Sequence, residues 1–342
     1  MFGPLLDALR SRHRVALTTH VAPDPDGLGS ALALKYGLEK LGVASEIVVT
    51  GPVSRRFAFL DPDRAIREYP APVDRACGDR EWGDREWGDR EWFAGFDAVV
   101  VLDCSDWARI GPVGDAFPKD ALKICIDHHA SNSGFADVTC ARVEATATAE
   151  LIHEFLCEHA GLAFDRRMAL PIYAALVTET GGFAYSNSTA KAHQLAARCL
   201  ELGVQPAEVH AALHQSEHLP ALKLAARALE KLEVDASGRL AWIALGMDDF
   251  RAAGATAEDI AGLVDYPRSL EGVEVAILMF EDEPRSTKVS FRSKAVLDMN
   301  QLAARVGGGG HVRAAGALIR ADLATAREQL LREAREAVKK LA

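Results

Sequence analysis

The sequence has no long hydrophobic run, since none approaches the length of about 18 apolar residues that a membrane-spanning helix needs. Its first ten residues also lack the charged start and the apolar stretch of a secretory signal peptide. Its six cysteines form no Cys-x-x-Cys pair, so neither a disulfide scaffold nor a cysteine-ligated zinc site is indicated. These absences predict a cytoplasmic protein that has reduced thiols and does not bind membranes.

Positive charge is also scarce. Lysine and arginine number 39 against 49 for aspartate and glutamate, which gives a formal net charge of −10. A protein that coats long duplex nucleic acid needs a basic face to neutralise many phosphates, so this class is excluded. The content of 49% hydrophobic and 26% charged residues also excludes a disordered or collagen-like chain. Any nucleic-acid substrate of so acidic a chain is therefore expected to be short.

Short apolar strands alternate with helical patterns in the first half of the chain. Strands are predicted at residues 14–19, 46–50, 97–103 and 122–127, and helices at 28–41, 146–160 and 166–178. The run from Ala98 to Leu102 is apolar throughout, as expected of a parallel strand that is covered on both faces. The alternation predicts an α/β fold with a mainly parallel sheet.

The length of 342 residues suggests two domains. We expect a catalytic domain at residues 1–190, a helical connector rich in alanine and leucine at 191–235, and a smaller C-terminal α/β domain at 236–342. The strands of the second domain are predicted near 239–245, 273–280, 287–292 and 313–320, with helices at 298–305 and 322–341.

Residues 78–92 are three copies of Gly-Asp-Arg-Glu-Trp, with three arginines, six acids and a net charge of −3. A five-residue period fits neither a helix nor a strand, and three copies are too short for a solenoid. The segment is therefore interpreted as a surface insertion into the first domain. A role of its tryptophans in binding a partner is left open.

The strongest chemical signal is a group of one imidazole and two carboxylates, His20, Asp24 and Asp26, between a predicted strand and a predicted helix. This is the edge of the sheet where α/β folds bind ligands. Pro23 and Pro25 favour extended backbone around Asp24, which spreads the two carboxylates and suits ligands of two different cations. A capping role would explain one of the acids but not the whole set.

Further acids and imidazoles lie at the same edge. Asp103 and Asp127 each end a predicted parallel strand, and Asp127 is followed by His128 and His129. Carboxylate and imidazole ligands without thiolate suit Mn²⁺, Fe²⁺ or Co²⁺. Two such ions about 4 Å apart can clamp a phosphoryl group and activate water. The clustered acids would repel one another without metal, which argues against a purely structural role.

Two further segments are candidates for the site. Glu179, in Thr-Glu-Thr-Gly-Gly, ends a predicted helix, where an exposed acid without a function would also be ordinary. Near the C-terminus, Gly307–Gly310 and His311 form a glycine-rich turn whose backbone N–H groups can approach an anion closely. Arg292, on a preceding strand, is positioned to add a guanidinium to the same phosphate.

In their order along the chain, these motifs resemble those of the DHH phosphoesterase superfamily. The matching motifs are His20-x-x-x-Asp24-x-Asp26, Asp103, and Asp127-His128-His129, and the segment from Gly307 to Gly316 resembles the accessory DHHA1 domain. The layout is similar to that of the compact nano-RNase and pAp phosphatase (NrnA-type) subgroup. That resemblance implies Mn²⁺-dependent hydrolysis of short 5′-phosphorylated oligoribonucleotides and of 3′-phosphoadenosine 5′-phosphate (pAp). Co²⁺, Fe²⁺ and Mg²⁺ remain alternatives to Mn²⁺, and a homodimer is left open.

The resemblance also implies roles for individual residues. One ion would be held by His20, Asp24 and Asp103. The second would be held by Asp26, Asp103, His128 and Glu179, with Asp103 as the bridge. His129 would face the phosphate and Asp127 would support the histidines, while the far phosphate would be bound by Arg292, Gly308, Gly309, Gly310 and His311. The family commonly has aspartate where this chain has Glu179, which makes its carboxylate one methylene longer.

Other functions fit parts of the same pattern. A pApA or cyclic-dinucleotide phosphodiesterase would use the same metal centre, and a non-catalytic nucleotide-binding regulator would carry a site altered at Glu179. A RecJ-like exonuclease is disfavoured because the chain is short and has no basic, aromatic-rich segment for single strands. A family II pyrophosphatase is disfavoured by the segment Gly307–His311, since that family has a different C-terminal domain.

Overall fold

The computed structural model describes residues 1–69, 90–129, 133–260, 262–310 and 312–339. The chain divides into two compact units, Met1–Ser216 and Glu217–Ala342. In the described ranges, every helix is too short or too polar to cross a bilayer.

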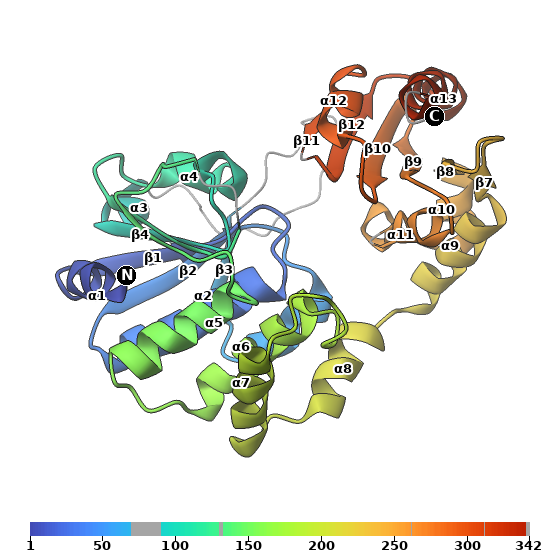
Figure 1. The fold of residues 1–342 in the computed structure, drawn as a ribbon. Helices are drawn as coiled ribbons and strands as arrows, with labels where there is room; N and C mark the ends of the chain where they lie inside the picture. Colours follow the sequence, from blue (N-terminus) through green and yellow to red (C-terminus); the bar gives the residue numbers. More distant parts are fainter. Residues whose placement is uncertain (70–89, 130–132, 261, 311, 340–342) are drawn as a thin grey trace. The chain divides into compact units, whose positions relative to one another are not determined.

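The first unit is built on a six-stranded sheet in which all pairings between the described strands are parallel (Figure 1). Its order is β3-β2-β1-β4-β5-β6. The strands are β1 (Arg14–Thr18), β2 (Ala44–Thr50), β3 (Ile66–Tyr69), β4 (Ala98–Leu102), β5 (Leu122–Asp127) and β6 (Val138–Ala141). The predicted mainly parallel α/β fold is confirmed. The two edge strands, β3 and β6, escaped prediction because they are only partly buried and lack an apolar run.

Helices cover both faces of this sheet. Val100 and Leu102 of β4 face one apolar core, and Val99 and Val101 face the other, which explains the continuous apolar run. The first core includes α1 (Phe2–Arg10), α2 (Pro25–Lys40), α5 (Thr148–His153), α6 (Arg166–Glu179), α7 (Ala190–Glu201) and α8 (Pro206–His214). The second includes α3 (Arg90–Ala94), a 3₁₀ turn at Trp107–Ile110 and α4 (Val113–Ala116).

The strand order places a topological switch point between β1 and β4. From this point the chain proceeds outward through β2 and β3 on one side and through β5 and β6 on the other. The connections therefore diverge beyond the carboxyl ends of β1 and β4, which is where open parallel sheets bind ligands.

The repeated pentapeptide lies only partly within the described residues, since 78–89 fall outside them. The end of the third copy begins α3, and Trp92 packs edge-on against Phe96 with ring centroids 4.9 Å apart. The Arg14 guanidinium lies 4.9 Å from the centre of the Trp92 ring. The last tryptophan of the repeat is therefore part of the packed structure, and the predicted surface insertion does not extend to residue 92.

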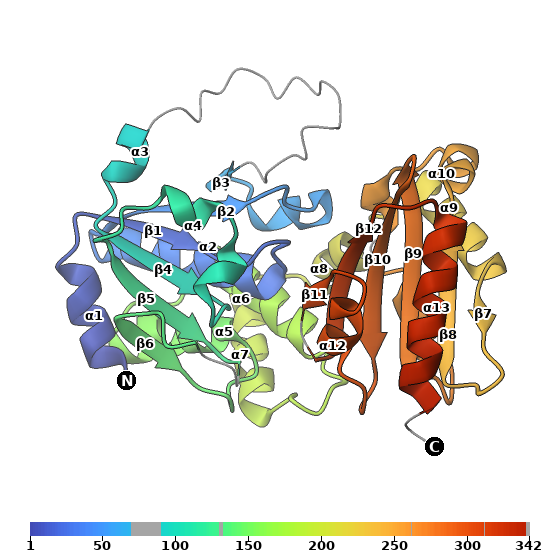
Figure 2. The same cartoon turned by 90° about the horizontal axis from the view of Figure 1, so that it is seen from above.

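The second unit contains a mixed six-stranded sheet of order β11-β12-β10-β9-β8-β7, in which only β8 and β9 pair in parallel among the described strands (Figure 2). Its strands are β7 (Glu233–Val234), β8 (Leu240–Leu245), β9 (Val275–Glu283), β10 (Ser286–Ser293), β11 (Gly309–Gly310) and β12 (Ala314–Ile319). One face packs against α12 (Met299–Ala304) and α13 (Leu323–Lys339). The other packs against α9 (Leu219–Glu230), α10 (Met247–Ala253) and α11 (Asp265–Ser269).

Candidate metal centre

The turn after β1 brings three of the predicted site residues to the switch point. Helix α2 begins at Pro25, three residues before the predicted start, so Asp26 lies in its first turn and is completely buried. Asp24 caps the helix, because its Oδ1 accepts hydrogen bonds from Asp26 N and Gly27 N, both at 3.0 Å. Its second oxygen, Oδ2, lies 3.7 Å from His20 Nε2. Asp24 therefore both caps the helix and contributes to the site.

Asp103, directly after β4, is held in a left-handed backbone conformation with a φ of 55°. This conformation is unfavourable for a residue with a side chain and is found preferentially at functional sites. Asp103 N donates to Ile126 O at 3.0 Å, which ties the bend to β5. The side chain is buried, and its Oδ1 accepts a 3.0 Å hydrogen bond from Thr148 Oγ1.

The segment after β5 is organised by the Asp127 carboxylate. Its Oδ1 accepts hydrogen bonds from His128 N at 2.9 Å, His129 N at 3.2 Å and His129 Nδ1 at 2.7 Å. His128 points its Nδ1 at Ala145 O, 3.2 Å away, which leaves Nε2 directed at the acids of the site. Asp127 thus fixes the main chain of both histidines and the ring of His129, whereas Ala145 O orients the ring of His128.

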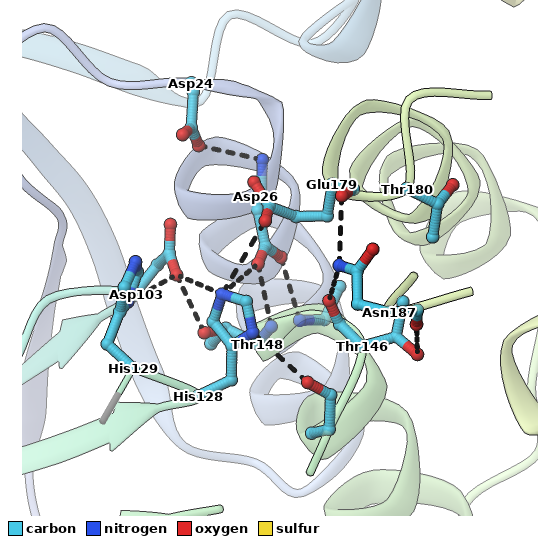
Figure 3. Close-up of polar contacts among 12 residues, drawn as sticks. Asp24, Asp26, Asp103, His128, His129, Thr146, Thr148, Glu179, Thr180 and Asn187 are labelled. Carbon is cyan, nitrogen blue, oxygen red and sulfur yellow. Dashed lines mark hydrogen bonds and ion pairs between the residues drawn. The ribbon is translucent and has the colours of Figure 1, made fainter. Parts of the chain in front are cut away.

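The two oxygens of the Asp103 carboxylate face different histidines. His128 faces Oδ1 (Figure 3), and His20 faces Oδ2. His20 Nε2 is 3.7 Å from Asp103 Oδ2, and His128 Nε2 is 3.5 Å from Asp103 Oδ1. These separations are longer than a hydrogen bond. They fit two ligands of one divalent ion, since ligand atoms about 2.1 Å from a shared ion lie at most about 4.2 Å apart.

Two more carboxylates surround His128. Its Nε2 lies 3.7 Å from Asp26 Oδ2 and 3.8 Å from Glu179 Oε2. The structure thus brings together all eight residues that the sequence predicted for the centre in the first unit, namely His20, Asp24, Asp26, Asp103, His128 and Glu179 and, beside them, Asp127 and His129.

The electrostatics of the centre indicate that cations belong there. Burial raises the pKa of Asp26 well above its usual value, and the negative charges of Asp103 and Glu179 raise it further. Burial, with Asp24 and Asp103 nearby, raises the pKa of Glu179 to about 7. His128 Nε2 is buried and has no hydrogen-bond partner. A divalent cation would satisfy this nitrogen and relieve the repulsion among the acids, so the residues present fit a metal site.

The other two histidines of the centre respond to the same acids. Burial lowers the pKa of His20, but the nearby carboxylates of Asp103 and Asp24 outweigh it and raise the pKa to about 10. For His129, the hydrogen bond to Asp127 raises the pKa above its ordinary value, against the opposing effect of burial. Burial alone would raise the pKa of Asp127, but its bond to His129 brings the pKa below the usual range.

The residues predicted to bind the far phosphate lie in the second unit. Gly309 and Gly310 form β11 and pair with Gly316 and Ala315 of β12, so this part of the glycine run is a short strand rather than an open loop. A Cβ on Gly308 would lie 2.2 Å from Gly316 O, so only glycine fits there. His311 lies outside the described residues.

Arg292, on β10, is half-buried. Burial lowers the pKa of its guanidinium, and Nη1 donates to Phe291 O at 3.0 Å. Within the described ranges it has no carboxylate partner closer than the ion-pair distance of 4.0 Å. A guanidinium in this state is suited to bind an anion.

Two residues that support the centre are not among those predicted from the sequence. Thr148 donates its backbone N–H to Asp26 Oδ2 at 2.7 Å and its hydroxyl to Asp103. Asn187 donates from Nδ2 to Glu179 O at 3.0 Å and to Thr146 O at 3.4 Å. Neither residue is marked by a local pattern, because Thr148 and Asn187 contact groups that lie elsewhere in the sequence.

Comparison with known proteins identifies the class. Residues 14–178 match the DHH family, N-terminal domain, and residues 242–341 match the DHHA1 domain. The two matches together cover most of the chain, which belongs to the DHH family and carries a DHHA1 domain. The resemblance inferred from the motifs is thereby confirmed.

Particular relatives are similar over almost their whole length. The chain is 29% identical to the bifunctional oligoribonuclease and PAP phosphatase NrnA of Thermus thermophilus, over 94% of this chain and 89% of the relative. It is 27% identical to the protein of the same name from Bacillus subtilis, over 89% of each. The fold is similar to that of an exopolyphosphatase-related protein from Bacteroides fragilis, with a TM-score of 0.85, 22% identity and coverage of 99% of this chain and 95% of that one.

Proposed function

We propose that the protein is a two-metal phosphoesterase that hydrolyses short 5′-phosphorylated oligoribonucleotides and pAp. The observation that carries this proposal is the position of Asp103, whose two oxygens face His20 Nε2 at 3.7 Å and His128 Nε2 at 3.5 Å. A carboxylate with an imidazole on each oxygen is suited to bridge two ions. The names of the NrnA relatives support the substrate assignment.

The first ion would be held by His20, Asp24 and Asp103, whose ligand atoms all lie within 4.8 Å of one another. The second would be held by Asp26, Asp103, His128 and Glu179. His129 also lies near Asp103, but its Nδ1 is bonded to Asp127 at 2.7 Å and is not free to bind an ion. We propose Mn²⁺ for both positions, because oxygen-rich sites with some imidazole suit it.

When bound, the two ions supply Lewis-acid polarisation of the phosphoryl oxygens and lower the pKa of water. His129 has a different role: its side chain is 41% exposed, and the bond to Asp127 favours its protonated form. It is suited to donate a proton or a hydrogen bond to a substrate phosphate, as general acids do. Asp127 keeps the ring in the orientation that this contact requires.

The far phosphate of the substrate would be bound by Arg292 together with Gly308, Gly309, Gly310 and His311 in the DHHA1 domain. A site that binds the distant end favours short substrates. This accounts for the acidic balance, because a few positive groups suffice for a small substrate.

The test is a time course of products with Mn²⁺, on pAp and on 5′-labelled RNAs of two to about ten nucleotides. We expect rapid hydrolysis of pAp and of the shortest RNAs, and rates that fall as length increases. Equal rates at all lengths would contradict the role of the DHHA1 domain. Exclusive turnover of pApA or cyclic dinucleotides would replace the proposed substrates, and no turnover would support a regulator.

A further inference from the structure

Asn187 connects two segments of the candidate metal centre that are remote in sequence. Its Nδ2 donates to Glu179 O at 3.0 Å, at the end of α6, and to Thr146 O at 3.4 Å, in the turn before α5 (Figure 3). Thr146 Oγ1 returns a hydrogen bond to Asn187 O at 3.0 Å. Asn187 therefore contacts Glu179 through its side chain, and Thr146 through both its side chain and its main chain.

The turn at residues 145–149 holds the residues assigned to the second ion. Ala145 O lies 3.2 Å from His128 Nδ1. Thr148 N and Ala149 N bind the two oxygens of Asp26 at 2.7 Å and 3.0 Å. Since Asn187 ties this turn to Glu179, it sets Glu179 relative to both Asp26 and His128.

The turn has a firm anchor of its own. Thr146 N donates to Oε2 of Glu150 at 3.0 Å, and the Glu150 side chain is buried. Arg142 Nη2 and Lys191 Nζ each lie 3.5 Å from Glu150 Oε1, which balances the buried charge. Asn187 therefore connects the main chain of Glu179 to a turn that is held by a buried glutamate with two cationic neighbours.

His20 and Asp24, the two residues assigned to the first ion alone, are held differently. His20 Nδ1 is 3.0 Å from Val21 O, and Asp24 accepts from the first turn of α2. Neither contact involves Asn187 or the turn at 145–149. The turn also reaches the shared ligand Asp103, but through Oδ1, the oxygen that faces His128, and not through Oδ2, which faces His20. The support that Asn187 gives is thus directed at the half of the centre assigned to the second ion.

We propose that Asn187 is a positioning residue that keeps Glu179 in place as a ligand of the second ion and leaves the first ion unaffected. The proposal rests on the two-ion assignment of the proposed function. Glutamate has more side-chain rotamers than aspartate, so Glu179 loses more rotamer entropy when it binds an ion. A fixed main chain at Glu179 is therefore more important than it would be for an aspartate. Residue 187 must also be a hydrogen-bond donor. An aspartate there would place a carboxylate oxygen against the carbonyl oxygens of Thr146 and Glu179.

The test measures Mn²⁺ binding to the full-length, metal-stripped protein by calorimetry, without substrate. In Asn187→Ala and in the isosteric Asn187→Asp, we expect one of the two binding equilibria to weaken by about 10- to 100-fold, as is usual when a group that orients a ligand is lost. The other equilibrium should stay within about twofold of wild type. Ser188→Ala, in the same loop, is the matched control, because the hydroxyl is hydrogen-bonded to His193 Nε2 at 3.3 Å and, among the described residues, to no group of the centre.

Two further backgrounds identify the ion that is affected. In Asp24→Asn, which impairs the first ion, Asn187→Ala should still weaken the remaining equilibrium. In the Glu179→Gln background, Asn187→Ala should weaken Mn²⁺ binding little further, because both changes act on the same ligand. Circular dichroism of each metal-free variant checks that the fold is retained.

The inference is overturned if both equilibria weaken equally, if neither changes, or if the wild-type chain binds fewer than two ions. A variant that loses its fold would shift both equilibria, and the isosteric Asn187→Asp then decides. Selective loss of one ion in a protein that hydrolyses neither pAp nor short RNA would overturn the proposed function and leave the role of Asn187 intact.

Discussion

The Thr148 hydroxyl donates a 3.0 Å hydrogen bond to Oδ1 of Asp103, the carboxylate that lies between His20 and His128. The same oxygen lies 3.5 Å from His128 Nε2, so Thr148 occupies one lone pair of the oxygen and directs the rest of the carboxylate at the centre. The orientation of the proposed bridge therefore depends on a side chain that is not itself a ligand.

Replacing Thr148 by valine removes this hydrogen bond while keeping the shape of the side chain. We expect kcat/KM for pAp to fall roughly tenfold or more, because a hydrogen bond to a charged group contributes about 1.5–3 kcal/mol. Thr148→Ser keeps the hydroxyl and should retain most of the activity. Equal activity of the valine and serine variants would show that Asp103 does not need this support.

Asp103→Ala removes the proposed bridge between the two ions. We expect turnover of pAp to fall below detection and both Mn²⁺ equilibria to weaken, in contrast to the single loss expected for Asn187. Asp103→Asn is the matched variant, which keeps the size of the side chain and removes its charge. Substantial hydrolysis by purified Asp103→Ala would contradict the two-metal assignment.

The part of the centre that could be predicted from the sequence is the part whose acids lie at the ends of buried strands. Asp103 follows the run Ala98–Leu102 and Asp127 follows the run Ile124–Ile126, both of which are apolar and buried, so the pattern of apolar residues predicts where the sheet edge lies. The predicted helix start at residue 28 is three residues too late, because prolines such as Pro25 are common in extended loops and are also favoured in the first turn of a helix.

The supporting residues could not be found in the same way. Thr148 contacts Asp26, 122 residues earlier, and Asp103, 45 residues earlier, and neither separation leaves a local pattern. Asn187 acts through backbone carbonyl groups, which every residue has, so its partners carry no signal in the sequence. These contacts are products of the tertiary fold.

Gly308 is expected to be required for the stability of the second unit. A Cβ there would lie 2.2 Å from Gly316 O and 2.6 Å from the Ala317 Cβ, so Gly308→Ala must displace β12. We expect a loss of about 1–3 kcal/mol, as for other overpacked sites. Thermal melts measure it against Gly309→Ala, whose Cβ would lie 3.6 Å from its nearest neighbour, Asn300 Oδ1. Similar melting temperatures for the two variants would argue against the close packing.

His153 is expected to make the stability of the first unit depend on pH. Its side chain is buried, and burial together with the charge of Arg198 lowers the pKa of the imidazole to about 4. The folded state therefore keeps the ring neutral at pH values where the unfolded chain, with a pKa near 6.5, binds a proton. The stabilisation is complete above about pH 6.5 and is lost as the pH falls toward 4.

Protonation of His153 in the unfolded chain therefore makes the free energy of unfolding lower at pH 5 than at pH 7, by on the order of 2 kcal/mol. Urea unfolding at the two pH values should show a smaller loss for His153→Gln than for wild type, because glutamine does not titrate. His210→Gln, at an exposed position of α8, is the control and should behave as wild type. If His153→Gln lost as much stability as wild type over this range, the buried imidazole would not be the group that couples folding to pH, and the acids of the metal centre would be the next to examine.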